Sequence, residues 1–106
     1  MPKYLYKANY THEGAKGLIK EGGTGRRAAV KKAVESMGGK LEAFYFAFGE
    51  TDVYAIAEMP DNVSAAAFAG LVGLGGGASA KTTVLITPEE VDEIVKKTAD
   101  YRPPGA

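Results

Sequence analysis

The chain has 106 residues, a length that suits one domain and leaves no room for a second catalytic one. Its 13 basic and 13 acidic side chains cancel, so we expect no binding of nucleic acid or of an anionic membrane surface. Cysteine is absent and His12 is the only histidine, which excludes disulfides and thiolate chemistry. No stretch has the pattern of a signal peptide or of a membrane span, and the sequence therefore predicts a cytoplasmic protein.

The first part of the chain is predicted to form a strand followed by two helical segments. Residues 3–10 alternate tyrosine and alanine with other residues, the period of two that is typical of a half-buried strand. Thr11 can cap a helical segment that runs to residue 20. The glycine-rich residues 21–25 interrupt this pattern, and residues 26–37 resume it with their apolar positions on one stripe.

Residues 41–58 have the pattern of a β-hairpin. Two runs rich in aromatic and apolar residues are joined at residues 49–52, where Glu50 and Asp52 supply acidic charge. We expect this hairpin to form the middle of a sheet, with the two carboxylates at one rim.

The second half begins with a predicted helix over residues 62–74, capped by Asp61 and so apolar that it needs cover on more than one side. A short β-branched strand is predicted at residues 81–86. Thr87, Pro88 and Glu90 then have the spacing of a capped helix start. The inner stripe of this last helix is expected to consist of Val91, Ile94, Val95 and Thr98. A domain over residues 1–100 is thus predicted, with a tail at 101–106.

This order of elements predicts an α+β fold of the ferredoxin-like type, βαββαβ, with an extra C-terminal helix. Its four-stranded antiparallel sheet would carry helices on one face only. We expect the other face to expose alternating apolar residues of the hairpin, which are Phe44, Phe46, Phe48 and Ile56. A patch of that kind favours self-association, so two sheets packed face to face would give a homodimer, and the helix at 62–74 would allow a higher homo-oligomer.

The run Phe48-Gly49-Glu50-Thr51-Asp52-Val53 resembles the Phe-Gly-Glu-Tyr-Asp-like turn of the GYD-domain family of short bacterial and archaeal proteins. Thr51 stands here in place of the family's tyrosine. Shorter matches at residues 10–14, 38–41, 60–61 and 87–90 extend the resemblance over most of the chain. The resemblance implies a ferredoxin-like build similar to the dimeric α/β-barrel superfamily, and it implies no established activity.

His12, Glu50 and Asp52 are predicted to meet at one rim of the sheet. In the ferredoxin-like order the first and third strands are antiparallel neighbours, so the end of one lies beside the start of the other. An imidazole with two carboxylates is suited to a divalent metal or to acid and base catalysis. The alternative is structural: the acidic residues solvate a tight turn, Asp52 bonds to local backbone groups, and His12 begins a helix.

A second candidate site lies on the face without helices. Strand parity places Tyr54 and Glu58 there, and the neighbouring strand supplies polar groups opposite them. With two phenylalanines as walls, such a cleft suits a small molecule; equally, it suits a dimer interface with buried pairing of Lys7 and Glu58. The candidate ligand-binding residues are Lys7, Asn9, Phe44, Phe46, Tyr54 and Glu58.

Arg26 and Arg27 follow the glycine-rich residues at a helix start. Backbone amides and guanidinium groups there suit a phosphate or a carboxylate, although the ending of a P-loop is missing. No complete catalytic motif is present anywhere in the chain. The sequence therefore favours a homo-oligomeric protein that binds a small ligand or a partner through its open sheet face. The alternative is a metal-assisted or cofactor-independent enzyme acting at the rim.

Overall fold

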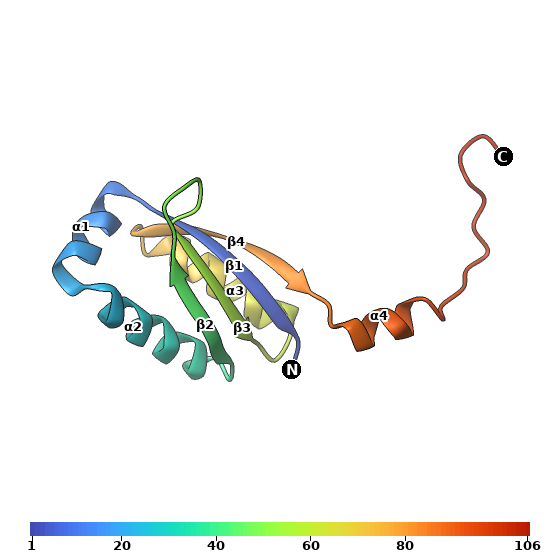
Figure 1. Cartoon of the computed structure of the whole chain (residues 1–106), viewed down its shortest axis with the longest axis horizontal. Coiled ribbons are helices and arrows are strands. Elements are labelled where there is room, and N and C mark those ends of the chain that lie inside the picture. The colour runs from blue at the N-terminus through green and yellow to red at the C-terminus, as the bar shows by residue number, and fades with distance from the viewer.

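The computed structural model describes residues 1–106 and has the predicted order of elements (Figure 1). In chain order these are β1 (Lys3–Tyr10), α1 (His12–Glu21), α2 (Gly23–Ser36), β2 (Lys40–Phe46), β3 (Val53–Glu58), α3 (Asn62–Leu74), β4 (Ala78–Leu85) and α4 (Pro88–Ile94).

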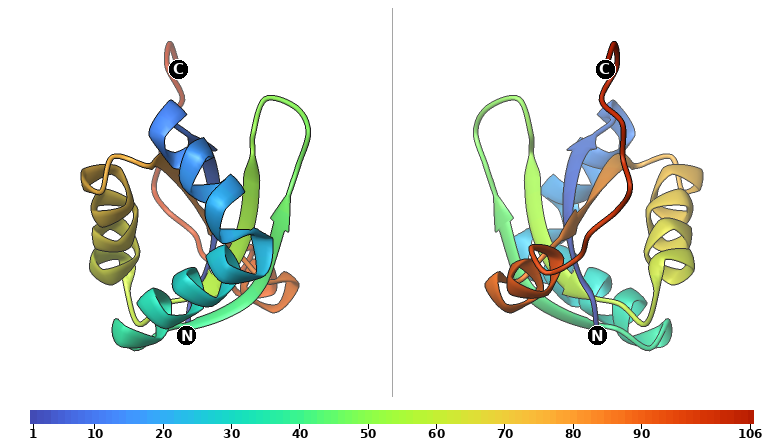
Figure 2. Two further views of the ribbon diagram at one scale, coloured as in Figure 1. Left: turned by 90° about the vertical axis from the view of Figure 1, so that its left-hand side faces the viewer. Right: turned by 90° about the vertical axis from the view of Figure 1, so that its right-hand side faces the viewer.

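The four strands form one sheet in the order β2-β3-β1-β4, and every neighbouring pair is antiparallel. This is the predicted α+β, ferredoxin-like arrangement. Helices α2 and α3 pack on one face of the sheet, α2 beside β2 and α3 beside β4. The loop between β2 and β3 projects beyond the end of the sheet (Figure 2). No helix packs on the opposite face, which we call the open face.

Large aromatic side chains of β1 and small side chains of β3 form the sheet's side of the core. Tyr4, Tyr6, Ala55 and Ala57 are buried there against residues of α2 and α3. The alanines let the helices approach closely, and the tyrosines fill the remaining space. Each tyrosine also needs a partner for its hydroxyl group in this dry setting.

Two hydrogen bonds satisfy these hydroxyl groups. Tyr4 donates to Asn62 Oδ1 at 2.5 Å, and Tyr6 donates to the carbonyl oxygen of Ala65 at 2.9 Å. The ring of Tyr6 meets Phe68 edge-on, with 5.2 Å between centroids. Burial raises the pKa of Tyr6 to about 12, so this side chain stays protonated and keeps donating through the neutral range. Core packing is thus the role of Tyr4 and Tyr6.

The prediction that the phenylalanines of the hairpin lie on the open face is wrong for β2. Phe44 lies opposite Ala55 and Phe46 lies opposite Val53, so both phenylalanines belong to the helix side of the sheet. Tyr45, opposite Tyr54, takes the open face instead. The cause is a register shift between Leu41 and Ala43, because one extra residue in a strand moves every later side chain to the other face.

Phe48 and the glycine-rich residues also differ from the prediction. Phe48 lies in the loop after β2 and is fully exposed, so it belongs to neither face. The helical pattern is interrupted at Gly22 alone, whose φ of 84° is a conformation that glycine adopts readily. Helix α2 therefore starts at Gly23, three residues before the predicted position, and β4 starts at Ala78 rather than at residue 81.

Helix α4 begins as predicted but packs differently. Thr87 accepts a hydrogen bond from the backbone N–H of Glu90, and the Glu90 side chain accepts one from Thr87 in return. The helix ends at Ile94, so Thr98 lies outside it. Its apolar stripe contacts no other element extensively, and α4 stands away from the rest of the chain (Figure 1). The radius of gyration is accordingly 17.0 Å, against about 13 Å for a compact chain of this length.

Candidate functional site

The rim predicted to carry His12, Glu50 and Asp52 is built around backbone hydrogen bonds. The carboxylate of Asp52 accepts from the N–H of Tyr10 at 2.9 Å. The N–H of Asp52 donates to the carbonyl of Ala8 at 3.1 Å and to Asn9 Oδ1 at 3.0 Å. The expected meeting of these two strand ends is confirmed. Asp52 fastens them together, and the groups that its carboxylate and its N–H bond to lie in β1 rather than in its own turn.

The other two rim residues do not join Asp52 as metal ligands. His12 is an exposed first residue of α1, and Glu50 is exposed in the hairpin loop. No group of three or more histidine, aspartate or glutamate side chains in the chain could hold a metal ion. The rim thus lacks the ligand cluster that the spacing of His12, Glu50 and Asp52 suggested.

The open face carries the predicted polar residues of β1 and β3 in a different pairing. Lys7 lies opposite Tyr54, and Lys3 lies opposite Glu58. Lys3 donates to Glu42 Oε1 at 2.5 Å, a hydrogen bond that raises the pKa of Lys3. Lys7 and Glu58 are four positions apart in this register, so they do not pair within the chain.

Beside Lys7, the open face has a pocket of about 210 Å³ with entirely polar walls. The structure brings together three residues that the sequence assigned to two different sites, which are Lys7, Asn9 and Glu50. Thr51, Ser79 and Lys81 complete the lining. The aromatic walls expected here are missing, because Phe44 and Phe46 lie on the other side of the sheet.

Arg26 and Arg27 point to different places and do not form one anion site. Arg27 lines a pocket of about 460 Å³ beside β2, whereas Arg26 lines the space between the helices and the sheet. Arg26 Nη1 lies 3.5 Å from Glu21 Oε2. That ion pair uses one of the five N–H groups of the guanidinium, which leaves others free for a ligand.

The space around Arg26 has both apolar and charged walls. Three cavities of about 330, 600 and 60 Å³ occupy the helix side of the sheet, and Tyr10 lines all three. We call them together the helix-side hollow. Its apolar walls include Leu18 of α1, Val72 of α3 and the two displaced phenylalanines of β2. Its polar side chains are Tyr10, Glu21, Arg26 and Asp52.

Tyr10 is held in place as the centre of this hollow. Its ring stacks near Phe46, with 6.5 Å between centroids and 24° between planes, and its backbone N–H is fixed by Asp52. Burial raises the pKa of Tyr10, and the neighbouring Arg26 opposes that rise in part. The hydroxyl group is therefore protonated at neutral pH and available as a donor or acceptor beside a guanidinium.

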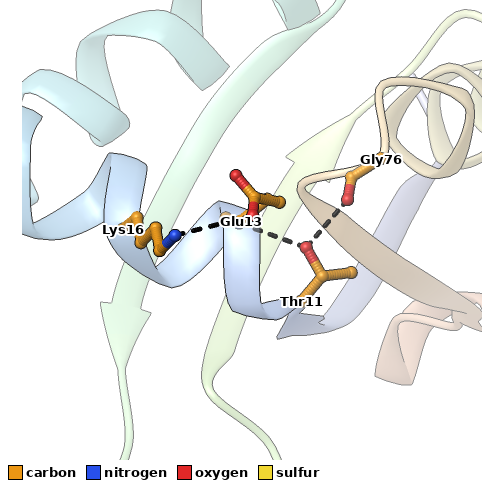
Figure 3. Close-up of polar contacts among 5 residues, drawn as sticks. Thr11, Glu13, Lys16 and Gly76 are labelled. Atoms are coloured by element: carbon orange, nitrogen blue, oxygen red, sulfur yellow. Dashed lines mark hydrogen bonds and ion pairs between the residues drawn. The ribbon is translucent and has the colours of Figure 1, made fainter.

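Glycines let α1 and the loop before β4 close one wall of the hollow. Thr11 accepts a hydrogen bond from the N–H of Gly14 and donates to the carbonyl of Gly76 at 2.8 Å (Figure 3). The N–H of Thr11 also donates to the carbonyl of Gly77 at 3.0 Å. A Cβ atom on Gly14 would lie 1.7 Å from that same carbonyl oxygen, so only glycine allows this approach.

An exposed ion pair lies on the outer side of α1, next to this junction. Lys16 Nζ is 3.8 Å from Glu13 Oε1, and both side chains are largely exposed (Figure 3). Such a pair contributes little to stability because water screens it. The junction is therefore fastened by Thr11 and the glycines rather than by these charges.

Sequence reasoning missed the hollow because its walls come from segments far apart in the chain. The signals that were available are the small residues at Gly14, Gly17, Gly75 and Gly77, all of which line it. Tyr10 continues the strand alternation of Tyr4 and Tyr6, but it is half-buried at the edge of the core rather than enclosed in it.

Comparison with known proteins identifies one family. The family model described as GYD domain matches residues 4–95, which confirms the resemblance seen in the hairpin turn. No significant match was found among curated proteins or among solved structures. None of the helices combines the length and the apolar character needed to cross a bilayer.

Proposed function

The chain belongs to the GYD domain family, and we propose that it is a homo-oligomeric protein that binds a small organic ligand in the helix-side hollow. The observation that carries this proposal is the position of Tyr10, which lines all three cavities and lies beside Arg26. A cytoplasmic location remains part of the proposal.

The size of the hollow supports a small-molecule ligand. Its two larger cavities measure about 330 and 600 Å³, and ligand pockets in proteins typically span about 300–1,000 Å³. Apolar walls with a few convergent polar groups are the usual composition of such pockets. The polar pocket on the open face is smaller, about 210 Å³, and has no apolar wall.

The chemistry of the lining supports a ligand with an apolar body and one acidic group. Arg26 can bind a carboxylate through two parallel N–H groups, and Tyr10 can add a hydrogen bond to the same group. Leu18 and Val72 offer contact to an aliphatic or aromatic body. Glu21 holds Arg26 through a long ion pair of 3.5 Å, and this carboxylate would give way to a ligand that binds more closely.

Self-association is supported by the exposed apolar surface of the single chain. Tyr45 and Tyr54 are 70% and 39% exposed on the open face, and Leu71 and Leu74 of α3 are 58% and 84% exposed. A sheet covered on one face only, with aromatic side chains on the other, is a surface that oligomers commonly bury. A second chain would supply the missing cover.

The experiment measures binding of small carboxylates, such as benzoate, phenylacetate and hexanoate, by titration calorimetry. We expect Arg26→Gln to weaken binding about tenfold or more, because a charged hydrogen bond is lost. Arg27→Gln is the matched control, since Arg27 is the next residue of α2 and lines a different pocket. Equal effects of the two substitutions, or no binding of any carboxylate to the wild type, would contradict the proposal.

A further inference from the structure

Helix α4 has an apolar stripe that nothing in its own chain covers. Val91, Ile94 and Val95 are spaced by three and four residues and therefore share one side of the helix. They are 44%, 51% and 72% exposed. A helix of seven residues is far below the length that is stable alone in water, about 12–15 residues. The capping box of α4 therefore needs a second surface that stabilises the helix.

The apolar stripe of α4 does not cover the open face of its own sheet. Only Ile86 and Thr87 separate β4 from α4, and Thr87 caps the helix. The helix leaves the end of β4 and extends away from the sheet (Figure 1), without extensive contact to any strand.

The open face of another copy has complementary charge. Lys7 and Lys81 lie directly opposite each other on β1 and β4, and like charges in that position are unfavourable. Around these two lysines the polar pocket supplies a single acidic group, the exposed Glu50. Helix α4 carries four acidic residues in its seven positions, which are Glu89, Glu90, Asp92 and Glu93. Leu5 and Ile56, neighbours on the same face, offer an apolar surface for the stripe.

We propose that α4 of each chain packs on the open sheet face of a second copy, so that two chains exchange their C-terminal helices. This proposal rests on the homo-oligomer of the proposed function and is independent of the ligand. The partner's helix gives the sheet its second cover, and the sheet gives the helix the tertiary contact that it needs. The acidic side chains of α4 then lie near the two opposed lysines.

Two sets of variants of the full chain test the exchange. Ile94→Asp places a charge in the stripe and is expected to raise the dimer dissociation constant at least tenfold, measured by analytical ultracentrifugation. Ile19→Asp is the control, because Ile19 is 87% exposed on α1 and should leave the dimer unchanged. In a chain without cysteine, Ile94→Cys combined with Thr83→Cys on the open face should form a disulfide-linked dimer. The same change combined with Ala80→Cys, which faces the helices, should not.

Three other outcomes would contradict the exchange, and each can be told from the others. A wild-type chain that sediments as a monomer overturns the exchange and the oligomer of the proposed function, while ligand binding can still be measured with Arg26→Gln. A dimer that Ile94→Asp leaves intact and that forms no linked dimer overturns the exchange alone. A disulfide formed within one chain between positions 83 and 94 shows α4 folded on its own sheet and also overturns it.

Discussion

Gly14→Ala is expected to destabilise the protein by opening the junction between α1 and the loop before β4. The added Cβ atom would lie 1.7 Å from the carbonyl oxygen of Gly77. Side-chain Cβ atoms essentially never approach other atoms closer than 3.0 Å, so the loop or the helix must retreat by more than an ångström. Thr11 bonds to both Gly76 and Gly77 in this place, and its two hydrogen bonds would be lost.

The magnitude follows from two opposing effects. Two hydrogen bonds contribute about 1 kcal/mol each to stability. Alanine in place of a helical glycine returns about 0.5–1 kcal/mol. The net loss is therefore roughly 1–1.5 kcal/mol. Gly17→Ala is the matched control, because a Cβ atom there meets nothing within 4 Å. This variant should gain only the stability that alanine gives a helix over glycine.

Urea denaturation followed by circular dichroism measures both variants. The predicted result is that Gly17→Ala is more stable than Gly14→Ala by about 2 kcal/mol, the contribution of the two hydrogen bonds. If Gly14→Ala proves as stable as Gly17→Ala, the close contact between α1 and the loop does not exist in solution. The wall of the helix-side hollow would then be misplaced as well.

Three further predictions concern the core and the helix caps. Burial raises the pKa of Tyr6 to about 12 from an ordinary 10.0. The protonated hydroxyl group of Tyr6 therefore contributes up to about 3 kcal/mol to folding stability below pH 10, and this contribution disappears as the pH rises to about 12. Tyr6→Phe should reduce the loss of stability at alkaline pH, measured by denaturation. The backbone N–H of Ser64 lowers the pKa of Asp61, so the stabilising effect of the Asp61 carboxylate should fade as acid protonates this group below pH 4. Asp61→Ala should lower the thermal midpoint of unfolding at pH 7, whereas Asp61→Asn should largely keep that midpoint. Thr87→Ala should destabilise α4 by about 1 kcal/mol, seen as a rise in amide exchange that is largest within that helix; an equal rise across the whole chain would contradict the local role of this cap.

The order of elements was predictable because each local signal agrees with the fold. The tyrosine alternation of β1, the cap at Asp61 and the box at Thr87 all form as expected. Antiparallel pairing of β1 with β3 then places Asp52 at the end of β1. These features depend on residues near each other in sequence or on the topology alone.

The facing of β2 was not predictable by alternation, because a register shift after Leu41 reverses the later side chains. The same shift moves Phe44 and Phe46 from the expected open-face cleft to the helix-side hollow. The hollow itself depends on how far α1 and α3 lie from the sheet, a distance that no local pattern encodes. Arg26 was identified from its place at a helix start, whereas no local pattern places Tyr10 beside it.

The central claim is that the ligand site is the helix-side hollow around Tyr10 and Arg26. The most direct test is a two-dimensional amide NMR titration of the full chain with the small carboxylates. We predict that the largest shifts cluster at residues 10–26 and 71–78, and that Arg26→Gln makes them clearly smaller at the same ligand concentration. Shifts confined to the open face at Lys7, Tyr54 and Glu58 would contradict the claim and return the site to the other side of the sheet.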